Sequence, residues 1–222
     1  KLREQSLIIE KQTALQNERT RIASEMHDDL GGGLTTIKFL SQSVEQQIQN
    51  DKAKRKLNKI VHQSQNLVTN MSEIIWAMNS GFDTLENLIA YCRRYASEYL
   101  NDNELKLEFN VTSSTENIEL FGEKRRNIFL VIKEALHNTV KHAKASHVHL
   151  SFSVRSDLII DISDDGIGLA KNIELNGNGM GNMKKRIQKI GGKIDFEDTV
   201  RGTKIKMKIP LKKNVDIPPN SP

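Results

Sequence analysis

The stretch that decides the fold is L-I-I-D-I-S-D-D-G-I-G, residues 158–168. Its apolar, β-branched first half predicts a buried strand, and Asp164 stands where that strand ends. A carboxylate at a strand end can accept a hydrogen bond from an adenine amino group, and Gly166 and Gly168 would let the backbone approach such a ligand closely. The alternative is an ordinary hairpin turn, which has the same composition.

Upstream, E-A-L-H-N-T-V-K-H-A at residues 134–143 has the periodicity of a helix. A spacing of three to four residues places Glu134, Asn138 and Lys141 on one face. A carboxylate, an amide oxygen and an ammonium group on one stripe can hold Mg²⁺ and a polyphosphate. A solvated helix face has the same composition, so this pattern alone is weak evidence.

Downstream, G-N-G-M-G-N-M at residues 177–183 opens a short helix that we expect near residues 182–190. Clustered glycines before a helix N-terminus offer free backbone N–H groups and a favourable dipole for phosphate. The alternative is a flexible loop. A dinucleotide-binding fold would need its glycines after the first strand of a βαβ unit, which is not their place in this sequence.

These three segments lie in a region whose pattern alternates between strand and helix. We expect strands at 105–111, 147–154 and 158–163, a long helix at 122–143 and two closing strands. The last strand alternates isoleucine or methionine with lysine over residues 204–209, so its lysines are expected to form a solvent face rather than a binding patch. The region therefore reads as a mixed α+β layer.

The N-terminal part of the chain follows a seven-residue period. Proline is absent from Leu2 to Asn50, and apolar residues recur every seven positions in two sets that are one residue out of phase. The sets are Ile8, Leu15 and Ile22, then Leu30, Ile37 and Val44. The offset falls beside His27, and the three glycines at 31–33 follow, each weakening a helix by roughly 1 kcal/mol relative to Ala. A purely structural coiled coil would not favour them.

A polar turn is expected at residues 50–55, followed by a second amphipathic helix that ends near Met78. Two such helices form a hairpin with an exposed apolar stripe. Pairing with a second copy into a four-helix bundle would bury that stripe, so the sequence predicts a homodimer.

Asn79, Ser80 and Gly81 break the helical pattern and are expected to form a hinge. A new helix follows, capped by Asp83 or Thr84, with Glu86 near the capping-box position. The expected organisation is a coiled-coil linker at 1–20, a helical hairpin at 21–80, a ligand-binding domain at 83–211 and a disordered tail at 212–222.

Composition excludes several classes of protein. The net charge of +5 comes from lysines and arginines spread among acidic residues, which does not favour a nucleic-acid partner. The single cysteine, Cys92, cannot form an internal disulfide and is expected to be a buried thiol in a reducing compartment. No apolar run approaches the roughly 18 residues of a membrane span. The chain begins without Met inside a helical pattern, so we expect a missing upstream part that could hold such a span.

The three segments in this order, closed by Gly202-Thr203 before the last strand, resemble the N, G1 and G2 boxes of the GHKL ATPases. This superfamily includes histidine kinases, gyrase, the Hsp90 chaperones and mismatch-repair ATPases. The resemblance implies an α/β-sandwich (Bergerat) domain that binds ATP between helices and sheet. It implies Mg²⁺ at Glu134 and Asn138, phosphate near Lys141 and adenine at Asp164. It also implies a wider binding set, comprising His142, Gly166, Gly168, Gly177, Met180, Thr203 and the lid residues Gly179 and Gly181.

The stretch E-R-T-R-I-A-S-E-M-H-D-D-L-G-G-G-L-T at residues 18–35 resembles the H box of the nitrate-sensor and desaturase-regulator (HisKA_3-type) subfamily of sensor histidine kinases. Together with W-A-M-N-S at 76–80 and D-T-L-E-N-L-I-A-Y at 83–91, it extends the resemblance over most of residues 18–211. The sequences of these segments are similar to those of kinases common in Bacteroidetes. The short gap between the G1-like and G2-like segments also fits this subfamily, whose lid is brief and lacks an F box.

The resemblance implies the cytoplasmic kinase core of a two-component sensor, anchored in the inner membrane through its full-length chain. Such a homodimer would use ATP to phosphorylate His27 and pass the phosphoryl group to an aspartate of a response-regulator receiver domain. Asp28 can orient the imidazole of His27 and take its proton, and Glu134 is the third residue expected to act in catalysis.

One position departs from the subfamily pattern. Its phosphatase motif, D-x-x-x-Q, starts at the Asp after the phospho-accepting His, but Gly32 stands at the Gln position that follows Asp28. Glycine has no side chain to position a hydrolytic water, so we expect weak phosphatase activity by this route. Asp29 is the nearby substitute.

Two other functions fit parts of the pattern. A GHKL protein can bind ATP and regulate a partner by binding or by serine phosphorylation, as anti-sigma kinases do; the H box argues against this function. A non-catalytic signalling scaffold with a relic nucleotide site is the second, and the intact Glu134, Asn138 and Asp164 argue against it.

Overall fold

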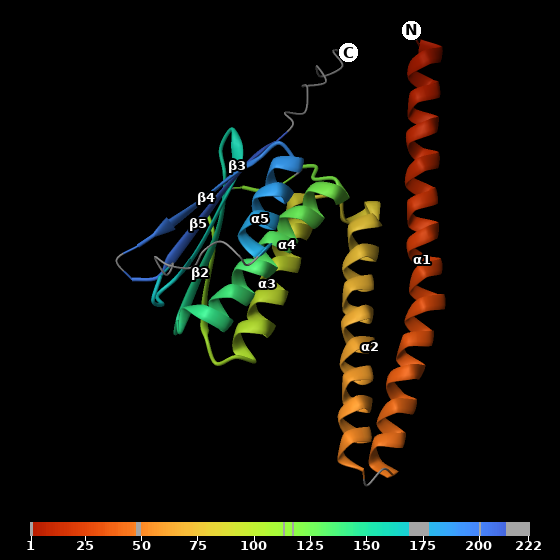
Figure 1. The fold of residues 1–222 in the computed structure, drawn as a ribbon. Coiled ribbons are helices and arrows are strands. Elements are labelled where there is room, and N and C mark those ends of the chain that lie inside the picture. Colours follow the sequence, from red (N-terminus) through yellow and green to blue (C-terminus); the bar gives the residue numbers. More distant parts are fainter. Residues whose placement is uncertain are drawn as a thin grey trace. The chain divides into compact units, whose positions relative to one another are not determined.

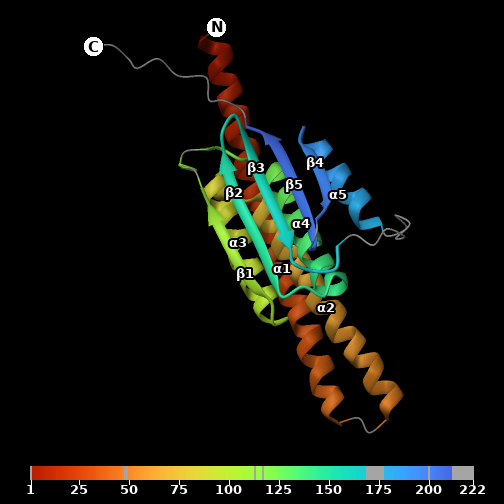
Figure 2. The same ribbon diagram turned by 90° about the vertical axis from the view of Figure 1, so that its left-hand side faces the viewer.

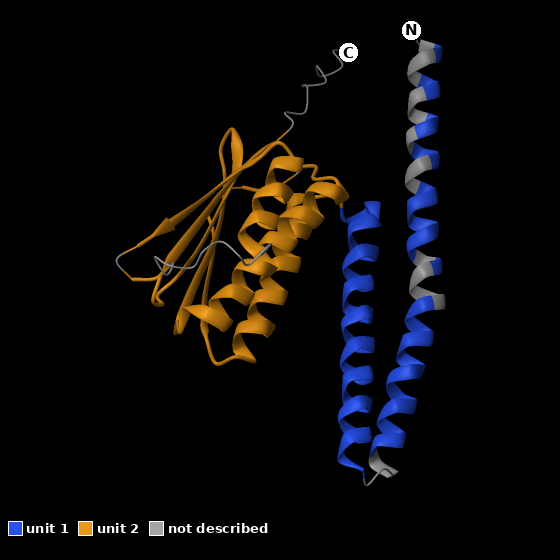
Figure 3. Cartoon of the chain, viewed as in Figure 1, with its two compact units in different colours: residues 1–82 blue, residues 83–222 orange. Residues whose placement is uncertain are grey.

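The computed structural model describes residues 2–47, 50–112, 114–116, 118–168, 178–199 and 201–211 (Figure 1). The chain divides into two compact units, residues 1–82 and 83–222 (Figure 3). Gly177 and the expected tail at 212–222 lie outside the described ranges. Among the helices within those ranges, none combines the length and the apolar character needed to cross a membrane.

The first unit is a helical hairpin of α1 (Leu2–Gln47) and α2 (Asp51–Met78) (Figure 1). Asn50 caps α2, because its Oδ1 accepts hydrogen bonds from the backbone N–H groups of Lys52 at 3.0 Å and Ala53 at 3.2 Å. The acidic first residue of the helix, Asp51, favours the same start. The predicted turn over residues 50–55 was therefore too long, because residues 51–55 already belong to α2 and only Asn50 precedes the helix as its cap.

Helix α1 continues through the three glycines at 31–33. A Cβ atom on Gly31 would lie 3.3 Å from Cε of Met71 in α2, whereas one on Gly32 or Gly33 would meet nothing within 4 Å. Packing therefore explains a glycine at position 31, because a side chain there would lie close to Met71 of α2.

Few of the apolar side chains that the structure describes in the hairpin are buried. They are Ala23, Met71, Trp76 and Ala77. Among its described residues, a set of large apolar side chains is between 44% and 66% exposed, comprising Leu7, Leu30, Ile37, Phe39, Leu40, Val44, Ile60 and Leu67. A single hairpin therefore leaves an apolar stripe uncovered.

The second unit begins after the 3₁₀ turn η1 (Ser80–Phe82), which follows the end of α2 as expected. Helix α3 (Leu85–Asn101) is capped by Thr84, whose Oγ1 accepts from the backbone N–H of Asn87 at 3.2 Å. Asn87 occupies the third helical position and its Nδ2 also donates to Thr84 Oγ1, so the expectation for Glu86 at the capping box was wrong by one residue.

A buried ion pair joins the start of this unit to α4 (Gly122–Asn138). Arg125 is fully buried and its Nη2 donates to Asp83 Oδ1 at 2.7 Å. The backbone N–H of Leu120 donates to the carbonyl of Asp83 at 2.9 Å, and that of Leu85 donates to the carbonyl of Ile118 at 2.9 Å. These contacts fix the start of α3 beside the start of α4.

A five-stranded mixed sheet forms one layer of the unit, in the order β1-β2-β3-β5-β4 (Figure 2). Strand β1 (Lys106–Val111) pairs in parallel with β2 (His147–Val154). The antiparallel neighbours β3 (Asp157–Asp164), β5 (Thr203–Pro210) and β4 (Lys193–Asp198) complete it.

Helices α3, α4 and α5 (Asn178–Lys189) cover one face of this sheet (Figure 1). The core between the two layers contains fully buried residues from both, among them Leu88, Ile132, Leu136, Leu150, Ile160 and Met207. On the other face Lys204 pairs with Asp161 at 3.5 Å and Lys208 with Asp157 at 3.2 Å, so the lysines of β5 form the expected solvent face.

Two helix boundaries differ from the sequence prediction. The helix expected over 122–143 changes at Thr139 into a π-helical turn, η2 (Thr139–Ala143), which ends at Lys144 with φ 51°. Helix α5 begins at Asn178 rather than near residue 182, so Gly179 and Gly181 lie in its first turn. Glycine has low helix propensity, and local pattern therefore placed this start too late.

The predicted fold class is confirmed: a helical hairpin precedes an α/β-sandwich of GHKL type with a mixed sheet. Pairing of two hairpins into a four-helix bundle stays a prediction.

Candidate functional site

A cavity of about 590 Å³ lies in the second unit. Its wall is built from α4 and η2, the end of β3, the first turn of α5 and the paired strands β4 and β5. The residues that line it are Glu134, Ala135, His137, Asn138, Thr139, Lys141, His142, Ala143, Asp164, Gly168, Gly179, Met180, Met183, Phe196, Thr203 and Ile205.

The polar stripe of the N-box-like segment faces this cavity. Glu134 and Asn138 come from the last turn of α4, while Lys141 and His142 come from the π-helical turn and are exposed. A π-turn widens the helix locally and is common at functional sites. Four polar side chains of one helical segment thus converge on one cavity.

The carboxylate of Asp164 is oriented by two backbone donors. Its Oδ1 accepts from the backbone N–H of Gly166 at 3.0 Å and of Thr203 at 3.3 Å. The hydroxyl of Thr139 has a single proton, which it can donate either to the carbonyl of Ala135 at 3.2 Å or to Asp164 Oδ2 at 3.5 Å. The carboxylate is therefore held in a defined direction at the cavity wall.

Most of the predicted binding residues meet here. Those that line the cavity are Glu134, Asn138, Lys141, His142, Asp164, Gly168, Gly179, Met180 and Thr203. Gly166 stands behind the wall against Ala143, and a Cβ atom on Gly181 would meet nothing within 4 Å. Gly177 lies outside the described residues. His27 and Asp28 lie in α1 of the other unit, and the described side chains do not include theirs.

The apolar part of the wall was missed by sequence reasoning. Phe196 of β4 and Ile205 of β5 are cross-strand partners that line the cavity together with Met183 of α5. The alternation in β5 marked Ile205 as buried. No local signal separated a cavity wall from the rest of the core, since both are apolar.

His137 was also missed, although it adjoins Asn138 in the sequence. It lines the cavity, and its Nε2 forms a hydrogen bond of 2.9 Å with the hydroxyl of Tyr95 in α3. The ring of Tyr99 lies 4.7 Å from the imidazole, centroid to centroid. A residue that lines the cavity is therefore held by a contact between α3 and α4.

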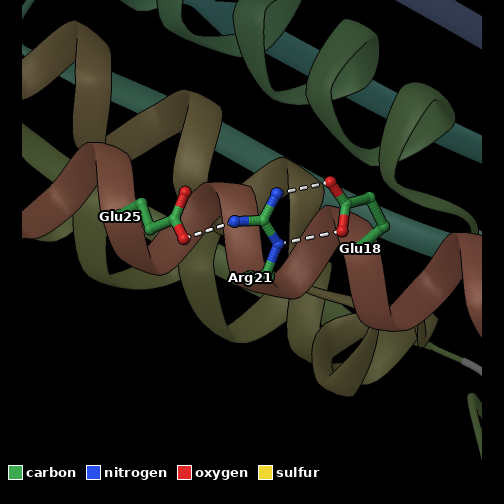
Figure 4. A network of polar contacts seen from close by, with 3 residues as sticks. All are labelled: Glu18, Arg21 and Glu25. Carbon is green, nitrogen blue, oxygen red and sulfur yellow. Dashed lines mark hydrogen bonds and ion pairs between the residues drawn. The ribbon is translucent and has the colours of Figure 1, made fainter.

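A charged network precedes His27 on α1 (Figure 4). The guanidinium of Arg21 donates to both carboxylate oxygens of Glu18, at 2.9 and 2.6 Å, and also to Glu25. Because Arg21 donates to it, the pKa of Glu18 lies below its usual value. The spacings of three and four residues make this a local stabiliser of α1.

The residues around the cavity fit ATP and Mg²⁺. Glu134 and Asn138 offer the oxygen ligands that Mg²⁺ prefers, and the apolar wall suits a purine base. A Cβ atom on Gly179 would lie 2.5 Å from Glu134 Oε1, so a larger residue would fill the space beside this carboxylate. Gly179 and Met180 from the first turn of α5 line the cavity, and the N-terminal turn of a helix favours an anion.

Comparison with known families assigns both units. The family described as Histidine kinase (HisKA_3) matches residues 18–81, and the family described as Histidine kinase-, DNA gyrase B-, and HSP90-like ATPase (HATPase_c) matches residues 123–213. The chain therefore contains a HisKA_3 histidine kinase domain followed by a HATPase_c domain. The first match covers α1 from residue 18 onward and all of α2, and the second covers the elements that build the cavity.

Curated relatives of this chain are bacterial sensor kinases. It is 29% identical over 213 residues to the sensor histidine kinase YvfT of Bacillus subtilis, which covers 93% of this chain and 54% of that protein. It is 24% identical over 206 residues to the oxygen sensor histidine kinase NreB of Staphylococcus carnosus, covering 90% and 58%. Identity to the sensor histidine kinase DesK of Bacillus subtilis is 29% over 198 residues, covering 87% and 51%. The chain thus spans about half the length of these relatives.

Solved structures support the fold of this chain. The histidine kinase domain of a blue-light activated kinase from Erythrobacter litoralis EL346 has a TM-score of 0.55 at 21% identity, covering 81% of this chain and 94% of that one. The histidine kinase AdeS of Acinetobacter baumannii has a TM-score of 0.53 at 18% identity, covering 81% and 98%. The expected likeness to kinases of Bacteroidetes stays a prediction.

Proposed function

We propose that the chain is an ATP-dependent protein-histidine kinase core that phosphorylates its own His27. The observation that carries this proposal is one cavity lined by Glu134, Asn138 and Asp164 in a chain that also has an H-box helix. The sensor kinase relatives support the same activity.

Each polar group of the cavity has a role in nucleotide binding. Asp164 accepts a hydrogen bond from the adenine amino group, for which its own donors orient it. Glu134 and Asn138 hold Mg²⁺, and Lys141 contacts phosphate. Bound Mg²⁺ would neutralise charge on the phosphates during transfer. The remaining binding residues are His142, Gly166, Gly168, Met180, Thr203 and the glycine lid of Gly177, Gly179 and Gly181.

His27 is the nucleophile of the proposed reaction. One ring nitrogen attacks the γ-phosphorus of ATP, the bond from that phosphorus to the β–γ bridging oxygen breaks, and ADP leaves with the electron pair. Asp28 takes the proton from the other ring nitrogen. Positioning and charge neutralisation supply most of the catalysis in such transfers. The segment at residues 79–82 serves as the hinge between the two units.

The proposed partners are a second copy of this chain and a response-regulator receiver domain, whose aspartate takes the phosphoryl group from His27. The uncovered apolar stripe of the hairpin supports the homodimer. In this proposal residues 1–20 form the signalling linker, 21–80 the dimerisation and phosphotransfer hairpin and 83–211 the ATP-binding domain. A cytoplasmic location and a membrane anchor beyond the residues given stay predictions.

Weak phosphatase activity follows from the same proposal. Gly32 occupies the position at which a glutamine would hold the hydrolytic water, and Asp29 is the nearby substitute. The chain is therefore expected to keep its response regulator phosphorylated longer than a glutamine-containing kinase would.

Incubation with γ-labelled ATP and Mg²⁺ tests the kinase activity. Wild-type protein should acquire an acid-labile label, His27→Gln should acquire none, and His62→Gln should behave as wild type because His62 is an exposed histidine of the same hairpin. Acid-stable label, or label that persists in His27→Gln, would show that the acceptor is another residue. The function as a GHKL regulator of a partner protein, which the comparisons do not favour, would give such a result.

A second variant tests the nucleotide site separately. Asp164→Asn should abolish ATP binding by fluorescence titration while sedimentation still shows the dimer. Unchanged ATP affinity would refute the adenine role of Asp164.

A further inference from the structure

The segment D-D-G-I-G contains two neighbouring carboxylates with different partners. Asp164 lines the cavity, whereas the partners of Asp165 lie at the start of β2. Asp165 Oδ1 accepts from the backbone N–H of Ser146 at 2.7 Å and of His147 at 2.8 Å. Its Oδ2 lies 3.0 Å from Nδ1 of His147. No role in the proposed reaction has been given to this side chain.

These bonds extend the pairing of β2 with β3 beyond the end of the ladder. The last paired residues are Val148 and Asp164, and the backbone N–H of Asp165 then donates to the carbonyl of His147 at 3.3 Å. The donors from His147 and Ser146 lower the pKa of the Asp165 carboxyl to about 2. The carboxylate is therefore charged, and accepting, at neutral pH.

The other end of the same segment is held by η2. The backbone N–H of Ile167 donates to the carbonyl of Ala143 at 2.8 Å. Gly166 fits against the same carbonyl so closely that an added Cβ atom would lie 2.2 Å from its oxygen. Between these two anchors, the N–H of Gly166 donates to Asp164 Oδ1. Displacement of Asp165 would therefore move a donor that orients Asp164.

We propose that Asp165 is a positioning residue of the nucleotide site, which ties the loop after β3 to the start of β2 and so keeps Asp164 directed at the adenine amino group. This inference rests on the proposed function. It predicts that Asp165 affects the choice of base, because adenine and guanine differ at the group that Asp164 recognises.

Four variants separate this role from a general effect on folding. Asp165→Ala removes the acceptor of two backbone N–H groups. Asp165→Asn keeps a side-chain oxygen for both of them. His147→Ala is the matched control, because it removes the imidazole but leaves both backbone donors. Asp164→Ala is the reference for complete loss of the base-reading carboxylate and should bind no ATP.

The experiment measures ATP and GTP affinities of these variants by fluorescence titration with Mg²⁺. Asp165→Ala should bind ATP about tenfold more weakly than wild type, as loss of charge-assisted hydrogen bonds implies, and its preference for ATP over GTP should shrink by a similar factor. Asp165→Asn and His147→Ala should stay within about threefold of wild type in both measures.

A nucleotide-free measurement gives an independent readout. The amide proton shifts of Gly166 and Thr203, the two donors to Asp164 Oδ1, should change in Asp165→Ala and stay near wild type in Asp165→Asn.

Two results would overturn the inference and leave the proposed function intact: wild-type ATP affinity and base preference in Asp165→Ala, or equal losses for ATP and GTP together with a matching fall in melting temperature. Wild-type protein that binds neither nucleotide would overturn the proposed function and this inference with it.

Discussion

The two units bury their apolar residues differently. In the unit of residues 83–222, Leu88, Ile132, Leu150 and Met207 are fully buried between the helical layer and the sheet. The hairpin instead leaves Phe39 and Leu40 62% exposed, along with the rest of its apolar stripe. Burial of apolar surface, worth about 25 cal/mol per Å², is the dominant stabilising term. The described core of the unit 83–222 is therefore buried within one chain, whereas the proposed second copy would cover the exposed apolar side chains of the hairpin.

This difference has a consequence for signalling. Since the described residues that line the cavity all belong to the unit 83–222, ATP affinity should be independent of dimerisation. Phosphorylation of His27 should depend on both units, because this proposed acceptor lies in the hairpin.

The largest expected effect is on the stability of the second unit. Asp83→Ala removes the carboxylate that pairs with fully buried Arg125, and loss of one partner of a buried pair costs about 3 kcal/mol or more. Denaturant unfolding followed at the second unit should show this loss, while sedimentation should show an unchanged dimer.

Glu86→Ala is the control, since Glu86 is an exposed acidic residue at the start of the same helix. Equal stability of the Asp83 and Glu86 variants would contradict the importance of the ion pair.

The second largest expected effect is on dimerisation of the hairpin. Ile37→Lys places a charge in the apolar stripe and should raise the dimer dissociation constant about 30-fold, equivalent to roughly 2 kcal/mol. Sedimentation velocity measures the change, and ATP titration should give the wild-type affinity.

Ser43→Lys adds the same charge at an exposed polar position of α1 and should leave the dimer intact. A fall in ATP affinity that follows dissociation of the dimer would show that the cavity is not complete in one chain.

The smallest expected effect is on ATP affinity, through a contact between α3 and α4. Helix α3 begins just after the junction and contacts His137 through Tyr95, so Tyr95→Phe should lower ATP affinity by up to about fivefold through loss of one hydrogen bond. Tyr99→Phe keeps the ring beside His137 and is the matched control. If both variants bind ATP equally well, the hydroxyl of Tyr95 has no influence on the cavity.

Sequence reasoning predicted the elements well where one period continued over many residues. The hairpin, the helix containing Glu134 and the alternation of β5 all follow from such periods. It failed at boundaries, where a single residue decides the outcome. Asn50 starts α2 through two backbone hydrogen bonds, and the glycines at 179 and 181 are helical although their propensity argues against it.

The candidate site was predictable where its residues fall in the three recognised segments and not where apolar residues outside them line the cavity. Asp164 and Asn138 stood out because polar residues in a fixed order resemble known boxes. Phe196 and Met183 did not, because an apolar residue looks the same in sequence whether it faces a cavity or the core. His137 was missed since its partner, Tyr95, lies 42 residues away.

The sequence by itself determined which residue types could serve a nucleotide and which histidine we propose as the phosphate acceptor, because those depend on residue type and local spacing. Only the tertiary structure decided that Glu134, Asp164 and Phe196 share one cavity and that Asp165 bonds to the start of β2. The reason is that the cavity forms only when burial of the core brings α4, the end of β3 and the paired strands β4 and β5 together. No local sequence pattern encodes the distances between these elements.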